Sequence, residues 1–177
     1  MSKTASPLSD NSPILIALGA NLPTAAFGPP RAALEAAVAE LGRRGLKVTR
    51  RSRWYESAPV PASDQPWYVN GVVEVETSLG PEALLSLLHE VEAAFGRVRR
   101  ELNAPRTLDL DLIAYGAAVR EEGPAPLLPH PRMADRAFVL LPLAEIRPDW
   151  RHPVLQRTAA ELAANLPNDQ PIRVAQG

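Results

Sequence analysis

Cysteine is absent from the 177-residue chain, which excludes disulfide bonds, thiolate catalysis and cysteine-bound metals. Lysine is rare, because 17 of the 19 basic residues are arginine, and the formal net charge is −1. This near-neutral charge argues against a surface that neutralises nucleic-acid phosphates. No apolar run approaches the roughly 18 residues of a membrane-spanning helix, and the N-terminus lacks the order of a signal peptide. We therefore expect a cytoplasmic protein in which any metal ion binds oxygen or imidazole ligands.

Aromatic residues make up only 5% of the chain, so we expect an aliphatic core. The length is typical of one domain. Residues 1–12 are polar and lack periodicity, which predicts a disordered leader. Residues 13–177 contain no repeat and no long linker, so they are expected to form a single domain.

Strand and helix patterns alternate over the first part of this domain. Apolar residues predict strands at 14–18, 46–56, 68–77 and 106–115, and helices at 30–41 and 81–95. The order βαββαβ is typical of an α+β, ferredoxin-like fold, in which an antiparallel sheet carries both helices on one face. We expect a helix from Met133 that Pro142 ends, and a short helix at 158–165. This C-terminal helical and loop region must cover the other sheet face.

Two carboxylates stand at alternate positions of the last predicted strand. On a strand, Asp109 and Asp111 share one face at roughly 6.5 to 7 Å, a spacing that can hold one or two divalent cations. Leu108, Leu110 and Leu112 would bury the opposite face. The pair alone is also compatible with a solvated, polar sheet face.

Arginines surround this acidic strand in the sequence. Arg97, Arg99 and Arg100 follow the second helix, and Arg106 begins the strand. A polyphosphate with Mg²⁺ would satisfy both sets of charges, because the carboxylates bind the metal and the guanidinium groups bind phosphate oxygens. Surface ion pairs are the alternative. The chain has no GxxxxGK[ST] motif, so this phosphate site is not a P-loop.

A further group of residues suits a flat molecule that forms hydrogen bonds. The proline-rich loop from Ser57 to Pro66 could form a pocket wall, since proline restricts the backbone. The amide of Asn70 could bind an acceptor and donor edge, and Tyr68 or Phe138 could stack on a ring. A strand-edge asparagine with ordinary core aromatics remains the alternative.

Five motifs, in order and at compatible spacing, resemble those of the 6-hydroxymethyl-7,8-dihydropterin pyrophosphokinase family of folate biosynthesis. They are Gly19-Ala20-Asn21-Leu22, Tyr68-Val69-Asn70, Gly96-Arg97-Val98-Arg99, residues 105–113, and Leu128 to Met133 followed by Arg136 and Phe138. The resemblance implies a ferredoxin-like core and the transfer of pyrophosphate from the co-substrate ATP to the pterin hydroxymethyl group. It also implies two Mg²⁺ ions and release of AMP. We expect a monomer that acts on small molecules, without nucleic-acid or membrane partners.

The resemblance assigns roles to matching residues of this chain. Asp109 and Asp111 would bind Mg²⁺ and would form the catalytic group together with three arginines, Arg97, Arg99 and Arg106. ATP would contact these arginines and also His89, Glu92, Leu112, Leu127, His130 and Arg136, with His89 and Glu92 on the exposed side of the second helix. The pterin would contact Ser57, Ala58, Val60, Tyr68, Asn70 and Phe138. Asn103 stands where many members carry a tryptophan in a loop that closes over bound substrates.

Two other classes of function fit parts of the pattern. A ferredoxin-like RNA-binding module has the same element order, but its stacking aromatics belong on the first and third strands, and Ile14 to Leu18 contains none. A Mg²⁺-dependent phosphohydrolase with an Asp-x-Asp motif has the same metal ligands but needs no ring-binding pocket. Formation of AMP, rather than of ADP and phosphate, would distinguish these classes.

Overall fold

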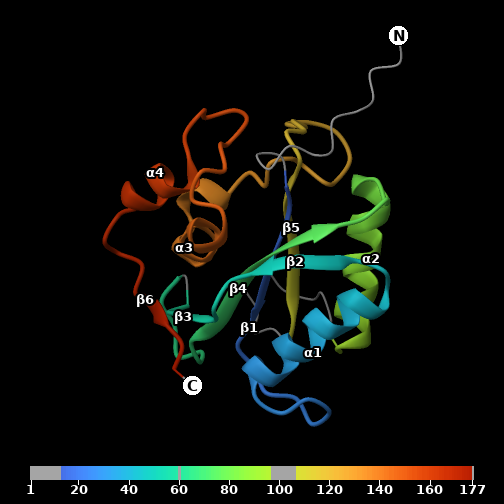
Figure 1. Ribbon diagram of the computed structural model, residues 1–177. Helices are drawn as coiled ribbons and strands as arrows, with labels where there is room; N and C mark the ends of the chain where they lie inside the picture. The colour runs from blue at the N-terminus through green and yellow to red at the C-terminus, as the bar shows by residue number, and fades with distance from the viewer. Residues whose placement is uncertain (1–12, 60, 97–106, 177) are drawn as a thin grey trace.

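The computed structural model describes residues 13–59, 61–96 and 107–176 (Figure 1). In chain order its elements are β1 (Ile14–Ala20), α1 (Pro30–Arg43), β2 (Lys47–Arg51), β3 (Tyr55–Ser57), β4 (Tyr68–Glu76), α2 (Pro81–Ala94), β5 (Asp109–Tyr115), the 3-10 helix η1 (Met133–Asp135), α3 (Ala137–Ile146), α4 (Ala159–Ala164) and β6 (Ile172–Val174). Pro30 and Pro81 occupy the first turns of α1 and α2, where the missing N–H of proline costs nothing.

The strands form one antiparallel sheet in the order β5-β1-β4-β3-β6, and β2 also pairs with β4. Strand β1 lies between β4 and β5, and every one of its residues is buried. The predicted ferredoxin-like fold class is confirmed, and the order through β5 is βαβββαβ in place of the predicted βαββαβ because the second predicted strand is divided into β2 and β3. Strand β6 extends the sheet beyond β3 and was not predicted.

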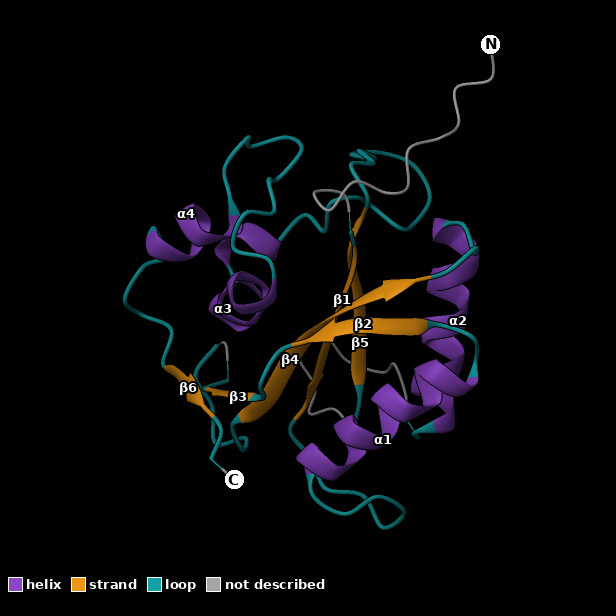
Figure 2. Ribbon diagram, viewed as in Figure 1, coloured by secondary structure: helices purple, strands orange, loops and turns teal. Residues whose placement is uncertain are grey.

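Helices cover both faces of the sheet (Figures 1 and 2). One hydrophobic cluster, which includes Leu34, Leu41, Leu88 and Val91, packs α1 and α2 against one face. A second cluster packs α3 and α4 against the other face and is centred on residues such as Leu140. The prediction that the C-terminal region covers the second face is therefore confirmed.

The single strand predicted over residues 46–56 is wrong, because the chain breaks into β2 and β3. Arg51 pairs with Val73 of β4, and Tyr55 pairs with Asn70. The chain therefore advances four residues from Arg51 to Tyr55 while β4 advances three. One extra residue therefore bulges between the two strands. Trp54 lies in this bulge and packs on Gly71, where a Cβ atom would lie 2.6 Å from the indole ring.

The helix predicted from Met133 to Pro142 is also wrong at both ends. Residues 133–135 form the separate 3-10 turn η1, and Arg136 is extended, with φ of −110° and ψ of 110°. Helix α3 then continues through Pro142 to Ile146. A proline in a helix interior removes one backbone hydrogen bond, but burial of Leu140, Leu143 and Ile146 stabilises the helix beyond it. The short helix near 158–165 is confirmed, with a capping box at its start.

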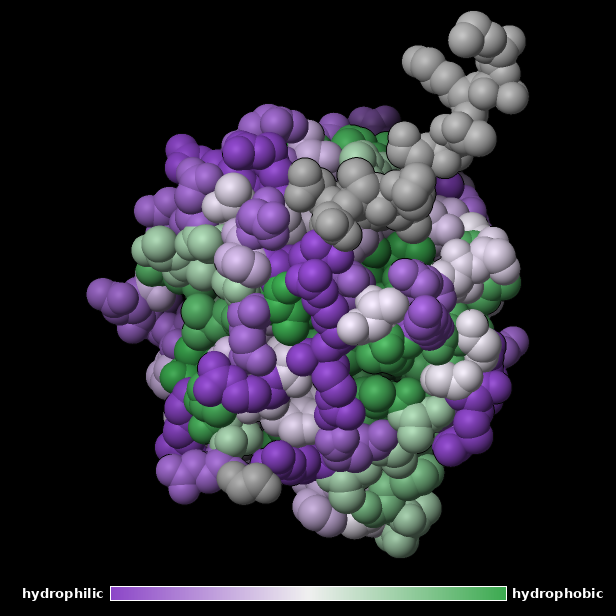
Figure 3. All heavy atoms as spheres, viewed as in Figure 1, coloured by the Kyte–Doolittle hydropathy of each residue, from purple (hydrophilic) through white to green (hydrophobic). Residues whose placement is uncertain are grey.

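Hydrophilic and hydrophobic residues are interspersed over the face shown in Figure 3, with a hydrophilic band down its middle. The large hydrophobic residues that are exposed come from separate segments, and include Trp67, Val119 and Leu155. Within the described residues, no helix has the length and apolar character that crossing a membrane requires.

Candidate active site

A cleft of about 690 Å³ lies where β1, β4 and β5 face the start of α3. Its floor is formed by the sheet, and its walls by the loop after β3, the η1–α3 junction and the C-terminal segment. The lining residues are Ala17, Leu18, Gly19, Ser57, Ala58, Pro59, Pro61, Ser63, Gln65, Tyr68, Asn70, Asp109, Asp111, Arg132, Asp135, Arg136, Phe138, Pro167, Asp169 and Gln170.

Asp109 and Asp111 both line this cleft from β5. The three leucines that alternate with them are at most 3% exposed, whereas both aspartates are half-buried. The strand therefore turns its apolar face to the core and its carboxylates to the cleft, as the alternation predicts. In the described parts of the chain no group of three His, Asp or Glu side chains could hold a metal ion.

The predicted position of Glu92 on the exposed side of α2 is wrong, because this residue is buried. Its side chain is only 1% exposed, and Oε2 accepts a hydrogen bond from the backbone N–H of Leu110 at 2.8 Å. The bond joins α2 to the strand that carries the two aspartates. Glu92 thus supports the carboxylate pair from behind, whereas His89, one turn earlier, is exposed.

The residues predicted to bind the ring also line the cleft, and Asn70 of β4 and Asp109 of β5 both pair with Gly19 of β1. Asn70 is 4% exposed, and its Nδ2 donates a hydrogen bond to Ser57 Oγ at 2.6 Å. Gly19 pairs with Asn70 across β1 and β4, and a Cβ atom at Gly19 would lie 2.9 Å from Asn70 Oδ1. A side chain at Gly19 would therefore displace the amide. Tyr68 and Phe138 line the same cleft from β4 and α3.

Asn21, in the turn that follows β1, forms hydrogen bonds to the loop between β3 and β4. The side-chain amide of buried Asn21 donates to Gln65 Oε1 and to the carbonyl oxygen of Pro66, both at 3.1 Å. Two donations from one amide fix the end of the loop that precedes Tyr68. The sequence motif around Asn21 therefore contributes to the shape of the cleft.

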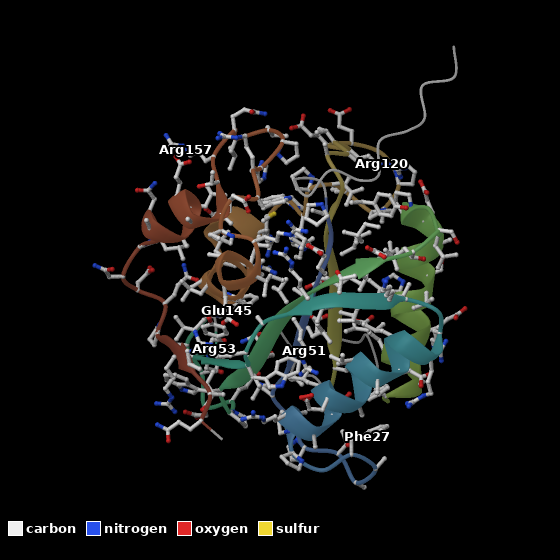
Figure 4. The ribbon with its side chains drawn as sticks, viewed as in Figure 1. Phe27, Arg51, Arg53, Arg120, Glu145 and Arg157 are labelled. Carbon is white, nitrogen blue, oxygen red and sulfur yellow. The ribbon has the colours of Figure 1, made fainter. Side chains whose placement is uncertain are left out.

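Helix α3 is anchored to β3 at its C-terminal end. Glu145 Oε1 accepts from the Tyr55 hydroxyl at 2.6 Å, and Oε2 accepts from the Arg53 N–H at 2.8 Å. Figure 4 shows Arg53 and Glu145 next to each other. At the N-terminal end of the helix, the Arg136 guanidinium lies over the Phe138 ring at 5.4 Å. The start of α3 thus carries both Arg136, a residue type that binds phosphate, and the aromatic ring of Phe138.

His130 is held in one orientation beside these charges. Its Nδ1 accepts a hydrogen bond from Arg132 N at 3.1 Å, and its backbone N–H donates to Ile113 O at 2.8 Å. Burial, together with the positive charges of Arg136 and Arg132, lowers the pKa of His130 to about 4, against the opposite effect of Asp109. The imidazole is therefore neutral at pH 7, with its proton on Nε2 as a hydrogen-bond donor.

The structure brings together part of the predicted site. The residues that line the cleft are Ser57, Ala58, Tyr68, Asn70, Asp109, Asp111, Arg136 and Phe138. Other predicted residues do not line it, namely His89, Glu92, Leu112, Leu127 and His130, and Leu112 is buried in the core. The remaining predictions, Val60, Arg97, Arg99, Arg106 and the substitution at Asn103, lie outside the described residues.

Several lining residues were not among the predicted site residues. Gly19 and Gln65 belong to segments that the sequence had already indicated, the first of the five motifs and the proline-rich loop before β4. Their position in those segments could have indicated that they line the cleft. Pro167, Asp169 and Gln170 come from the C-terminal segment, which shows no periodic pattern or motif. Their place in the cleft depends on tertiary contacts alone.

The sequence matches the family model of 7,8-dihydro-6-hydroxymethylpterin-pyrophosphokinase (HPPK) over residues 15–148. This chain belongs to that family. It is 44% identical over 149 residues to the 2-amino-4-hydroxy-6-hydroxymethyldihydropteridine pyrophosphokinase of Synechocystis sp., an alignment that covers 84% of this chain and 73% of that protein. It is 41% identical over 143 residues to the protein of the same name from Pseudomonas aeruginosa, with 79% and 83% covered.

Some relatives are much longer than this chain. The folic acid synthesis protein fol1 of Pneumocystis carinii is 39% identical over 145 residues, which cover 82% of this chain but 19% of that protein. A crystal structure of a Plasmodium falciparum HPPK-DHPS variant with pterin and p-hydrobenzoate has a TM-score of 0.65 and covers 89% of this chain and 45% of that chain. At 14% identity this likeness concerns the fold alone.

Proposed function

We propose that this chain transfers the pyrophosphoryl group of ATP to the hydroxymethyl group of 6-hydroxymethyl-7,8-dihydropterin, in folate biosynthesis. One observation carries the proposal beyond family membership. A single cleft contains the carboxylates of Asp109 and Asp111 and, next to them, the aromatic and amide side chains of Tyr68, Asn70 and Phe138. A phosphate-handling pair and a ring-binding slot in one cleft suit a reaction between a nucleotide and a heterocycle.

The residues present fit Mg²⁺ as the metal. Mg²⁺ prefers oxygen ligands and is usually bound by one or two carboxylates together with substrate phosphates and water. Asp109 and Asp111 offer such a pair on one face of β5. When bound there with ATP, two Mg²⁺ ions would neutralise phosphate charge and lower the pKa of the attacking hydroxyl.

In the proposed step the hydroxymethyl oxygen attacks the β-phosphorus of ATP in line with the leaving oxygen. A new oxygen–phosphorus bond forms, the bond from the β-phosphorus to the oxygen that bridges to the α-phosphate breaks, and AMP leaves with that oxygen. The hydroxyl proton is released. Arg136, with Arg97, Arg99 and Arg106, would stabilise the charge on the phosphate oxygens.

The slot would position the other substrate. Tyr68 and Phe138 would stack on the two faces of the pterin, since aromatic rings bind flat heterocycles in this way. The buried pair of Asn70 and Ser57 would bind its polar edge, because the Ser57 hydroxyl that accepts from Asn70 still has a proton to donate. Such contacts orient the hydroxymethyl group toward the carboxylate pair.

Incubation of the protein with ATP, Mg²⁺ and the hydroxymethyl pterin tests this function. Chromatography and phosphorus NMR should detect AMP and the pterin diphosphate in equal amounts. A pterin that carries a 6-methyl group in place of the hydroxymethyl group is the matched control, because it keeps the ring and lacks the acceptor oxygen. It should yield no AMP. Release of ADP and phosphate, with or without the pterin, would instead identify a phosphohydrolase.

A further inference from the structure

The two walls of the ring-binding slot are joined by a segment that lies beyond the matched family region, residues 15–148. We call residues 167–172 the tail segment. Pro167, Asp169 and Gln170 of this segment line the cleft. The tail segment thus forms part of the same cleft as Tyr68 and Phe138.

Gln170 attaches the tail segment to the wall that carries Phe138. Its Oε1 accepts a hydrogen bond from Ala137 N at 2.9 Å, and its Nε2 donates to Asp135 O at 2.8 Å. A backbone N–H can only donate and a carbonyl can only accept, so these partners fix the orientation of the amide. The two hydrogen bonds lie on either side of Arg136.

Helix α3 needs this contact at its first residue. The first N–H groups of a helix have no partner within the helix, and a capping side chain usually supplies one. The residue at the N-cap is Arg136, whose guanidinium has no acceptor atom and cannot cap. Gln170, which is distant in the sequence, supplies the acceptor to Ala137 instead.

The other end of the tail segment is attached to the wall that carries Tyr68. Ala58 N donates to Pro171 O at 3.1 Å, and Ile172 pairs with Ser57 in the ladder between β3 and β6. Ser57 pairs in turn with Tyr68 of β4. The side-chain hydrogen bonds of Gln170 and the backbone pairing of Pro171 and Ile172 therefore connect the start of α3 to Tyr68.

We propose that Gln170 is a positioning residue that sets the separation of Phe138 from Tyr68 and so the affinity of the slot for the pterin ring. This inference rests on the proposed function. Glu145 anchors the far end of α3 to Tyr55 independently, so loss of the Gln170 contacts should displace only the start of the helix, where Arg136 and Phe138 lie. A change at Gln170 therefore affects the pterin more than ATP, because Phe138 is one of two rings proposed to stack on the pterin, whereas Arg136 is one of four arginines proposed to bind phosphate.

The test compares variants by their KM for each substrate. Gln170→Leu removes both hydrogen bonds and should raise the KM for the pterin about tenfold, while the KM for ATP stays within about twofold. Gln170→Glu keeps an acceptor for Ala137 N but loses the donor and turns a carboxylate oxygen toward Asp135 O, so the KM for the pterin should rise in this variant as well. Asn168→Leu is the control, since Asn168 is exposed in the same segment and does not line the cleft.

Three outcomes would overturn the role of Gln170. They are an unchanged pterin KM in Gln170→Leu, an equal rise of both KM values, and an equal effect of Asn168→Leu. If Gln170→Leu fails to fold, the KM values of Gln170→Glu for the pterin and for ATP are compared with those of the wild type instead. The proposed function fails separately, when the wild-type protein forms no AMP from ATP and the pterin.

Discussion

Glu92 Oε2 accepts a hydrogen bond from the backbone N–H of Leu110 at 2.8 Å. Leu110 stands between Asp109 and Asp111 on β5, which is an edge strand of the sheet. An edge strand presents N–H groups that no neighbouring strand can bind. The buried Glu92 of α2 accepts the hydrogen bond of one such group, the Leu110 N–H. This bond connects the helix to the part of β5 that carries the carboxylate pair.

Replacement of Glu92 by leucine should destabilise the protein. The change leaves the buried Leu110 N–H without this acceptor, and an unsatisfied buried donor costs about 1 to 3 kcal/mol. Urea denaturation should show the free energy of unfolding reduced by about this amount. Glu90→Ala, on the same helix, removes only an exposed ion pair with Arg44 and should cost less than about 1 kcal/mol. Equal effects of the two changes would contradict the supporting role of Glu92.

Asp109→Ala and Asp111→Ala should each abolish transfer and preserve the fold. Loss of a metal ligand removes several kcal/mol of charge stabilisation, which corresponds to about a thousandfold in rate or more. Both side chains are half-buried, and removal of one like charge from a shared face relieves repulsion in the free protein. AMP formation measures the loss of transfer, and circular dichroism tests whether the fold is preserved. Asp64→Ala, an exposed aspartate of the loop before β4, is the control and should retain activity.

Sequence patterns predict well those elements whose side chains repeat with a fixed period. The alternation of leucine and aspartate in β5 predicts both its buried face and its carboxylate pair, because successive strand residues point to opposite faces. The helical spacing of Leu84, Leu88 and Val91 likewise predicts the buried face of α2. The same spacing contains the signal that was missed for Glu92, which lies four residues after Leu88 and hence on the same face.

The remaining differences come from tertiary contacts that no local pattern encodes. Pro142 remains inside α3 because the helix is buried against the sheet, and packing outweighs the lost hydrogen bond. Gln170 lies 33 residues from Ala137 and 35 from Asp135, so nothing in the neighbourhood of any of the three indicates their contact. Strand β6 has three residues and forms through its pairing with β3.

Asn70→Leu should weaken pterin binding and leave ATP binding nearly unchanged. The buried amide donates a hydrogen bond to Ser57 in the ring-binding slot, and the proposed phosphate contacts are made by other residues of the cleft. A site built to bind polar groups loses affinity strongly when its own polar groups are removed, so we expect a rise of at least about tenfold in the pterin Kd. Calorimetric titration with each substrate measures both constants. Equal loss of ATP binding would place Asn70 in the structural core.

Gly19→Ala gives an independent check of the same amide. A Cβ atom at this position would lie 2.9 Å from Asn70 Oδ1, so the amide must shift while its own chemistry is retained. Pterin binding should fall in this variant as well, although no polar group has been removed. Wild-type affinity in Gly19→Ala would show that the position of the Asn70 amide does not matter for the ring.

The stability of the protein should depend on pH through His130. Burial and the nearby charges of Arg136 and Arg132 lower the pKa of this imidazole from 6.5 to about 4 in the folded state. Between these two pH values the unfolded chain binds a proton that the folded protein does not, so the free energy of unfolding falls as the pH is lowered through this window. Above pH 6.5 the histidine is neutral in both states and contributes no slope.

Replacement of His130 by glutamine removes this contribution. Urea denaturation at pH 7, 6 and 5, without Mg²⁺ or ATP, should show a steeper loss of stability in the wild-type protein than in His130→Gln. Titration of the acidic groups affects both proteins alike and cancels in the difference. The free energy of unfolding of the wild-type protein minus that of His130→Gln should therefore decrease as the pH falls from 7 toward 5. Parallel curves would mean that His130 takes up protons equally in the folded and unfolded states, and that its environment is more open than the buried position beside Arg136 implies.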